Sequence, residues 1–176
     1  MLTLRSAHHR RRHGAALILV LAVLVVLLGM AVLMVDLGYL MAVKSRVQSA
    51  ADGASMAGAL RLRADYEDPK FGDLAAIAIK FAELNQPSIK GVLKKSDIEI
   101  GEWDSASRLF SPGASHTNAV RVTVRRNSSQ SSSVTLFLGN TFGSKEADLN
   151  VVSVCAFEVY EDEDGNDEMT RPFLVQ

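Results

Sequence analysis

The ionisable side chains of this 176-residue chain offer little from which a catalytic centre could be built. His116 is the only histidine beyond residue 13, and it stands in the polar segment "ASHTN". Acid–base or nucleophilic catalysis needs several such groups gathered at one place, whereas a lone histidine in a loop is usually just solvated. The sequence therefore predicts no enzyme and no catalytic residues.

Metal and cofactor binding have equally little support. Cys155 is the only cysteine, so the chain can form neither an internal disulfide nor a thiolate metal cluster. The segment "YEDEDGNDE", residues 160 to 168, has the composition of a calcium loop. Aligned with an EF-hand, however, it places Tyr160 at the first ligand position and Arg171 at the last, and neither side chain can serve there. We expect no metal site and no cofactor, and an acidic tail in this region.

An apolar run from Gly14 to Val35 contains 22 residues without a charge. At about 1.5 Å per residue it makes roughly 33 Å of helix, enough to cross a hydrocarbon core of about 30 Å. The arginines before the run favour a cytoplasmic N-terminus and an outer C-terminal domain. A cleaved secretory signal is the alternative, with a small-residue site at Gly29-Met30-Ala31. Helical patterning that continues beyond Ala31 favours an uncleaved, single-pass anchor.

The segment outside this run is rich in small residues. No proline occurs before residue 69, so the span and its extension can form one helix. Small residues recur every four positions along it, which lets another backbone approach closely. Two interpretations stay open: a partner helix packs there, or the chain's own sheet does. The candidate partner-packing residues are Ala50, Gly53, Ala54, Ala57 and Gly58.

The rest of the chain predicts an α+β fold. A second helix is expected between Asp68, as its N-cap, and Pro87. Alternating apolar residues predict strands at 97–104 and 119–126, with a short edge strand between them and a central strand in 149–160. Residues 133–139 fit either a strand or a short helix. The expected architecture is a long N-terminal transmembrane helix that continues outside the membrane, a second helix and an antiparallel sheet of about four to five strands, which is compatible with a pilin-like arrangement.

Five segments follow from this pattern. The chain is expected to divide into a cytoplasmic basic arm (1–13), a transmembrane helix (14–35), a helical extension (36–66), an exported α+β domain (67–160) and an acidic tail (161–176).

The junction between the span and its extension carries a resemblance to a known family. The stretch "VDLGYLMAVKSRVQSAADGASMAGAL", residues 35 to 60, resembles the N-terminal module of the Tad-type (Flp) pilus assembly proteins, the TadE/TadG-like group. In that group an apolar span runs into V-D-L-G, an Arg/Gln pair and an Ala-rich stretch. The strands "IEIGEWD" and "AVRVTV" resemble the family's distal part more weakly. The matching residues of the membrane-boundary motif are Asp36, Gly38, Arg46, Gln48 and Asp52.

The resemblance implies a single-pass component of a Tad/Flp pilus assembly or secretion apparatus, which is anchored in the bacterial inner membrane with a periplasmic C-terminal domain and acts by subunit packing. Its partners would be other Tad/Flp subunits and the lipid bilayer, with a homo-oligomer as a further option and no nucleic acid. One departure bears on its place in the machine: Leu19 stands five residues after Gly14, where processed pilins carry a glutamate. The alternative function is a membrane-anchored or secreted periplasmic ligand-binding module unrelated to pili.

Overall fold

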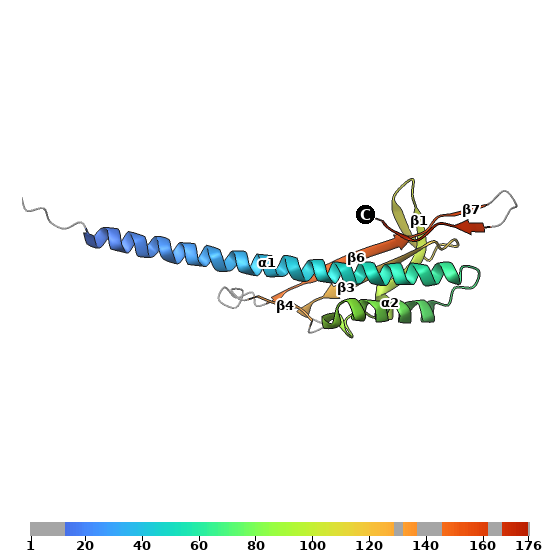
Figure 1. Cartoon of the computed structure of the whole chain (residues 1–176), viewed down its shortest axis with the longest axis horizontal. Helices are drawn as coiled ribbons and strands as arrows, with labels where there is room; N and C mark the ends of the chain where they lie inside the picture. The colour runs from blue at the N-terminus through green and yellow to red at the C-terminus, as the bar shows by residue number, and fades with distance from the viewer. Residues whose placement is uncertain (1–12, 129–131, 137–145, 162–166, 176) are drawn as a thin grey trace, which may run out of the picture.

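The computed structural model describes residues 13–128, 132–136, 146–161 and 167–175. Helix α1 runs without interruption from His13 to Ala64, a length of 52 residues. Its first half projects away from a domain formed by the rest of the described chain (Figure 1). The expectation of one helix through span and extension is confirmed, because nothing in the sequence before residue 69 interrupts its backbone hydrogen bonds.

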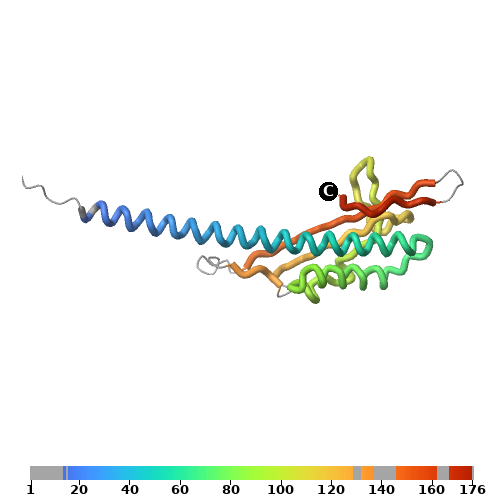
Figure 2. The backbone as a smooth tube through the Cα atoms, viewed as in Figure 1, coloured from blue at the N-terminus to red at the C-terminus, as the bar shows by residue number. Residues whose placement is uncertain are grey.

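Helix α2, Phe71–Asn85, lies beside the last part of α1 and runs back along it (Figure 2). The predicted N-cap was wrong: Lys70 holds that position, and no side chain caps the helix. Asp68 instead belongs to the turn that follows α1, where its backbone N–H donates to the carbonyl of Asp65 at 3.0 Å. Two 3₁₀ turns, Pro87–Ile89 and Lys95–Asp97, connect α2 to the sheet.

The main sheet has five strands in the order β2-β1-β3-β6-β9, and each neighbouring pair is antiparallel. Its strands are β1 (Ile98–Asp104), β2 (Leu109–Pro112), β3 (Ala119–Arg126), β6 (Leu149–Ala156) and β9 (Phe173–Val175). The expected short edge strand is β2, and the expected central strand is β6, which pairs with β3 on one side and β9 on the other. The predicted α+β architecture is thus confirmed.

Two small hairpins complete the described chain. One pairs β4 (Val134–Thr135) with β5 (Glu146–Ala147), which makes part of the ambiguous segment 133–139 a strand, while residues 137–139 lie outside the described part. The other pairs β7 (Val159–Glu161) with β8 (Asp167–Met169). The segment expected as an acidic tail therefore supplies two strands, β8 and β9, although its most acidic residues, 162–166, lie outside the described part.

The core lies between the helices and one face of the sheet. Val120, Val122 and Val124 alternate along β3 and are fully buried on this face, where their partners on β6 include Cys155 and Val151. From α1 the core receives Val43 and Val47, then a run of alanines and Leu62. Because the helix contributes mostly small side chains, its backbone lies close to both the sheet and α2.

Candidate functional site

The half of α1 that projects from the domain is apolar around its whole circumference. The large side chains between Leu17 and Val35 are about 50% exposed or more, apart from Val32, which is partly buried. Within the described residues, α1 is the one helix long and apolar enough to cross a membrane, with a mean hydropathy of 3.3 over its best window. A helix this apolar on every side requires an apolar environment.

The first three residues of the boundary motif stand in different surroundings. Asp36 is only 7% exposed, although it follows directly on the apolar run. No side chain lies near Gly38, and a Cβ there would meet nothing within 4 Å. Arg46 is exposed on the part of α1 that enters the domain. The structure therefore spreads these residues along the helix and does not gather them into one site.

Gln48 and Asp52 do come together. The Gln48 side-chain amide donates to Oδ1 of Asp52 at 2.8 Å and makes a longer contact, 3.4 Å, with the carbonyl oxygen of Val152 in β6. One turn further along, the hydroxyls of Ser55 and Ser153 lie 2.9 Å apart in the buried interface. This series of polar contacts fixes the register of α1 along β6, which is a structural role for two residues of the motif.

The five candidate packing residues divide into two sets. Ala50, Ala54 and Gly58 are buried inside the domain, and a Cβ on Gly58 would lie 3.0 Å from Val120 and 3.6 Å from Leu74. Here the small residues allow close approach of the chain's own β3 and α2, one of the two interpretations that the sequence left open. These contacts within the chain are enough to explain why the three residues are small. A role in packing against a partner stays an untested prediction for them.

Gly53 and Ala57 also line a hollow of about 450 Å³ between α1 and α2, although Ala57 is only 7% exposed and a Cβ on Gly53 would meet the side-chain amide of Asn85. Its walls are almost entirely apolar and continue the same stripe of α1 to Leu60 and Ala64. Leu60 is 50% exposed and Phe81, on the α2 side, is 47% exposed. We call this surface the α1–α2 groove; it is lined by Gly53, Met56, Ala57, Leu60, Arg61, Ala64, Ile77 and Phe81. The spacing of small residues did not point to Leu60 and Phe81 as groove residues, although Leu60 follows Gly53 by seven residues, two turns along one face.

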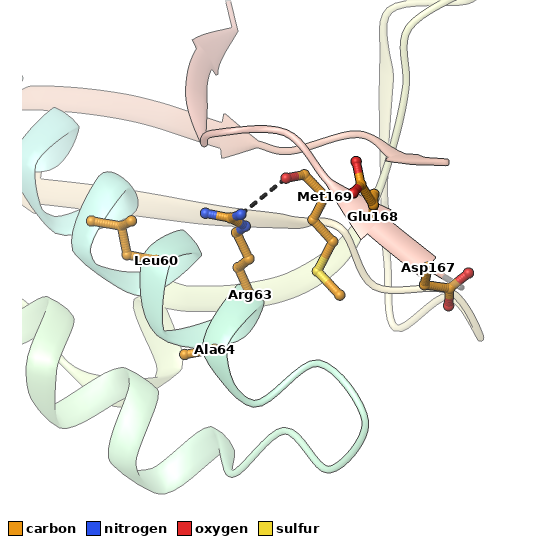
Figure 3. A pocket seen from close by; sticks show the side chains of 6 residues that line it. All are labelled: Leu60, Arg63, Ala64, Asp167, Glu168 and Met169. Carbon is orange, nitrogen blue, oxygen red and sulfur yellow. Dashed lines mark hydrogen bonds between the residues drawn. The ribbon is translucent and has the colours of Figure 1, made fainter. Parts of the chain in front are cut away.

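A second hollow, of about 520 Å³, lies where α1 ends (Figure 3). Arg63 points into it from α1, and Asp167, Glu168 and Met169 border it from β8. The guanidinium of Arg63 donates to the carbonyl oxygen of Met169 at 3.0 Å, so this cation ties the C-terminal hairpin to the helix. Within the described residues no three His, Cys, Asp or Glu side chains are grouped so as to hold a metal ion.

Cys155 is buried in the core beside Met56, with the two sulfur atoms 3.6 Å apart. Burial, with a smaller effect from the charge of Asp52, raises the pKa of the Cys155 thiol to about 12. A thiol with this pKa is almost entirely protonated at pH 8, and the thiolate is the reactive form.

We therefore expect Cys155 to resist thiol reagents in the folded protein. At pH 8 its reaction with an aromatic disulfide reagent should be at least a hundredfold slower than in 6 M guanidinium chloride, because both burial and pKa suppress attack. The measurement is the absorbance of the released thiolate with time. Equal rates in the two solvents would contradict the buried position.

Comparison with known protein families places these features in context. The family model described as putative Flp pilus-assembly TadE/G-like matches residues 14–61, which is α1 except its ends. A second model, putative Tad-like Flp pilus-assembly, matches residues 41–154, from the outer part of α1 through most of β6. Searches of curated proteins and of solved structures each gave no significant match. Since the second match alone covers well over half of the chain, this chain belongs to the Tad-like Flp pilus-assembly family.

Proposed function

We propose that the protein is a single-pass membrane component of a Tad/Flp pilus assembly apparatus that acts by packing against other subunits and not by catalysis. Membership of the family supports a role in Tad/Flp pilus assembly. In the proposed topology α1 crosses the bacterial inner membrane, the N-terminal basic arm is cytoplasmic and the α+β domain is periplasmic. The arginines that precede the span support this orientation.

The observation that carries the packing role is the α1–α2 groove. The half-exposed side chains of Leu60 and Phe81 border an almost wholly apolar hollow, which is a surface that an apolar partner helix could cover. The groove runs along the same helix that carries the apolar span, so a second membrane-anchored subunit would emerge from the bilayer roughly parallel to it. We assign the groove to an apolar helix of another Tad/Flp subunit, which would pack against Leu60 and Phe81.

Deletion of the gene tests the function itself. A deletion strain should lose sheared surface filaments and adherence, and the intact chain should restore both. Normal filaments in the deletion strain would contradict a role in pilus assembly, whatever the groove binds.

Acidic substitutions in the groove test the packing role. Complementation with Leu60→Asp or Phe81→Asp should leave at least tenfold fewer filaments, because an unpaired carboxylate buried in an apolar contact costs several kcal/mol. Both positions are exposed in the isolated chain, so the protein should still fold and reach the membrane fraction in normal amounts.

Ala76→Asp provides the matched control, since Ala76 is an exposed position of α2 that does not line the groove. It should restore filaments fully. Equal filament counts for the groove variants and this control would contradict the assignment of the groove to a partner while leaving the pilus role intact.

A further inference from the structure

The apolar exposed surface of α1 does not stop at Val35. Beyond it Leu37, Tyr39 and Met41 are 53%, 51% and 63% exposed, and the first exposed charge is Lys44. From Leu17 to Met41 the apolar surface covers roughly 37 Å of helix, more than the roughly 30 Å of a hydrocarbon core. A tilt of about 35°, inside the observed range, would keep all of it in hydrocarbon.

Asp36, the one acid in this stretch, does not prevent α1 from lying deeper in the membrane. A carboxylate facing lipid would be costly, but Asp36 is only 7% exposed and so has little contact with its surroundings outside the chain. The domain begins within this stretch, since the chain itself covers Asp36, Leu40 packs against the core, and Val43 and Val47 belong to the core. No helical stalk separates the apolar surface of α1 from the domain.

The end of the domain nearest the apolar stretch can be identified from the contacts of β6. Gln48 contacts Val152, and Met56 contacts Cys155, so β6 and α1 run in the same direction. The start of β6 and the end of β3 therefore lie at the end from which α1 projects, as Figure 1 shows. The turn Lys95–Asp97 lies at this end too, because Arg125, near the end of β3, pairs with Asp97 at 2.7 Å.

Basic side chains predominate at this end. Among the described residues the acids there already accept hydrogen bonds from the chain itself: Asp97 from Arg125 and Lys94, Glu83 from Gly91, Glu146 from Ser133, and Asp148 from Ser128. The lysines are exposed, as are Arg46 and Arg125. The basic residues of this end are Lys44, Arg46, Lys90, Lys94, Lys95, Arg125 and Arg126, against the four acids named above.

We propose that the domain is seated directly on the bilayer, with the hydrocarbon boundary near Met41 and the basic end of the domain against the phosphate groups of anionic phospholipids. The inference rests on the proposed membrane span of α1 and adds its depth and the lipid that the domain recognises. Each basic side chain near an anionic surface contributes about 1 kcal/mol at most, so several together hold the domain down. The seating also fixes the height at which the α1–α2 groove faces a neighbouring subunit.

Spin labels on the full chain in lipid nanodiscs test the depth. Single cysteines would be introduced by Val25→Cys, Met41→Cys and Ser107→Cys, with the protected native Cys155 as the unlabelled background. Oxygen concentrates in hydrocarbon, whereas a nickel chelate stays in water. The collision rate of the spin label with oxygen, relative to that with the chelate, should therefore be high at positions 25 and 41. It should be low at position 107, in the exposed turn between β1 and β2. A ratio at 41 equal to that at 107 would overturn the seating. A low ratio at 25 would show that α1 does not span the membrane, which would refute the proposed function.

A label from Ser96→Cys, in the exposed turn between Lys95 and Asp97, tests the lipid contact. Nickel-chelating lipid present in trace amount should relax this label at least twofold faster in nanodiscs with 30% phosphatidylglycerol than in pure phosphatidylcholine. The double variant Lys94→Gln/Lys95→Gln should abolish that difference, while Lys70→Gln, a substitution at the far end of α2, should preserve it. Equal relaxation in the two lipids would overturn recognition of anionic phospholipid.

Discussion

A leucine in place of Gly58 is expected to destabilise the outer domain by about 3 kcal/mol or more. The added Cβ would lie 3.0 Å from Val120 and 3.6 Å from Leu74, so a leucine side chain would have to displace these two buried residues. Overpacking of a well-filled core usually costs 1–3 kcal/mol, and more where backbone must move. Replacement of a helical glycine returns only about 1 kcal/mol.

The measurement is thermal unfolding of the full chain in detergent, followed by the fluorescence of Trp103, the only tryptophan. Gly58→Leu should lower the Tm by more than 10 °C, since each kcal/mol shifts the Tm of a domain this size by about 4–8 °C. Gly72→Leu is the control, because Gly72 in the first turn of α2 has nothing within 4 Å of its Cβ position. An unchanged Tm for Gly58→Leu would contradict the intramolecular packing of this residue.

This result bears on how partner binding can be tested. Loss of co-purified subunits in Gly58→Leu would be a consequence of unfolding and would say nothing about a partner helix. Leu60 and Phe81 are better positions, since they are half exposed and contribute to the groove without filling the core. The small residues of α1 mainly serve packing within the chain: Gly58 faces Val120 of the sheet, and Gly53 faces Asn85 of α2 at the edge of the groove.

Local sequence patterns predicted the elements whose signal is periodic and uninterrupted. Helix α1 follows from a proline-free apolar run, and strands β1 and β3 follow from alternation at Ile98–Ile100 and Val120–Val124. The pattern could not decide what the small residues of α1 pack against, because a close backbone contact has the same sequence signature whether it lies within one chain or between two. The position of β3 and α2 relative to Gly58 is set by contacts distant in sequence.

Strand β9 shows a second limit of local analysis. It has only three residues, Phe173–Val175, follows the acidic segment and shows too short an alternation to be read as a strand. Its strand conformation depends on pairing with Val154–Ala156 of β6, more than fifteen residues earlier. The predicted start of α2 was wrong for a related reason. Asp68 is a residue type that often caps helices, but its backbone N–H is already hydrogen-bonded in the turn after α1.

Truncation of Phe157 to alanine is expected to have the other large effect. Phe157 is fully buried just after β6, and its ring meets the edge of Tyr66 with centroids 6.0 Å apart. Tyr66 follows the end of α1, so this aromatic pair closes the domain at the end opposite the basic residues. Removal of a buried phenylalanine side chain costs about 3–5 kcal/mol, part of it from the cavity left behind.

Phe157→Ala should therefore lower the Tm of the Trp103 transition by more than 10 °C, whereas Val152→Ala, at a position of β6 that is 48% exposed, should lower it by only a few degrees. Insertion of α1 into membranes should be unaffected, because the apolar stretch makes no contact with Phe157. A strain that carries Phe157→Ala should then lose filaments through reduced protein level, which an immunoblot would detect, whereas the groove variants should lose filaments at normal protein level. Equal protein levels in the two kinds of variant would contradict this division of α1 into a face that supports the fold and a face that binds a partner.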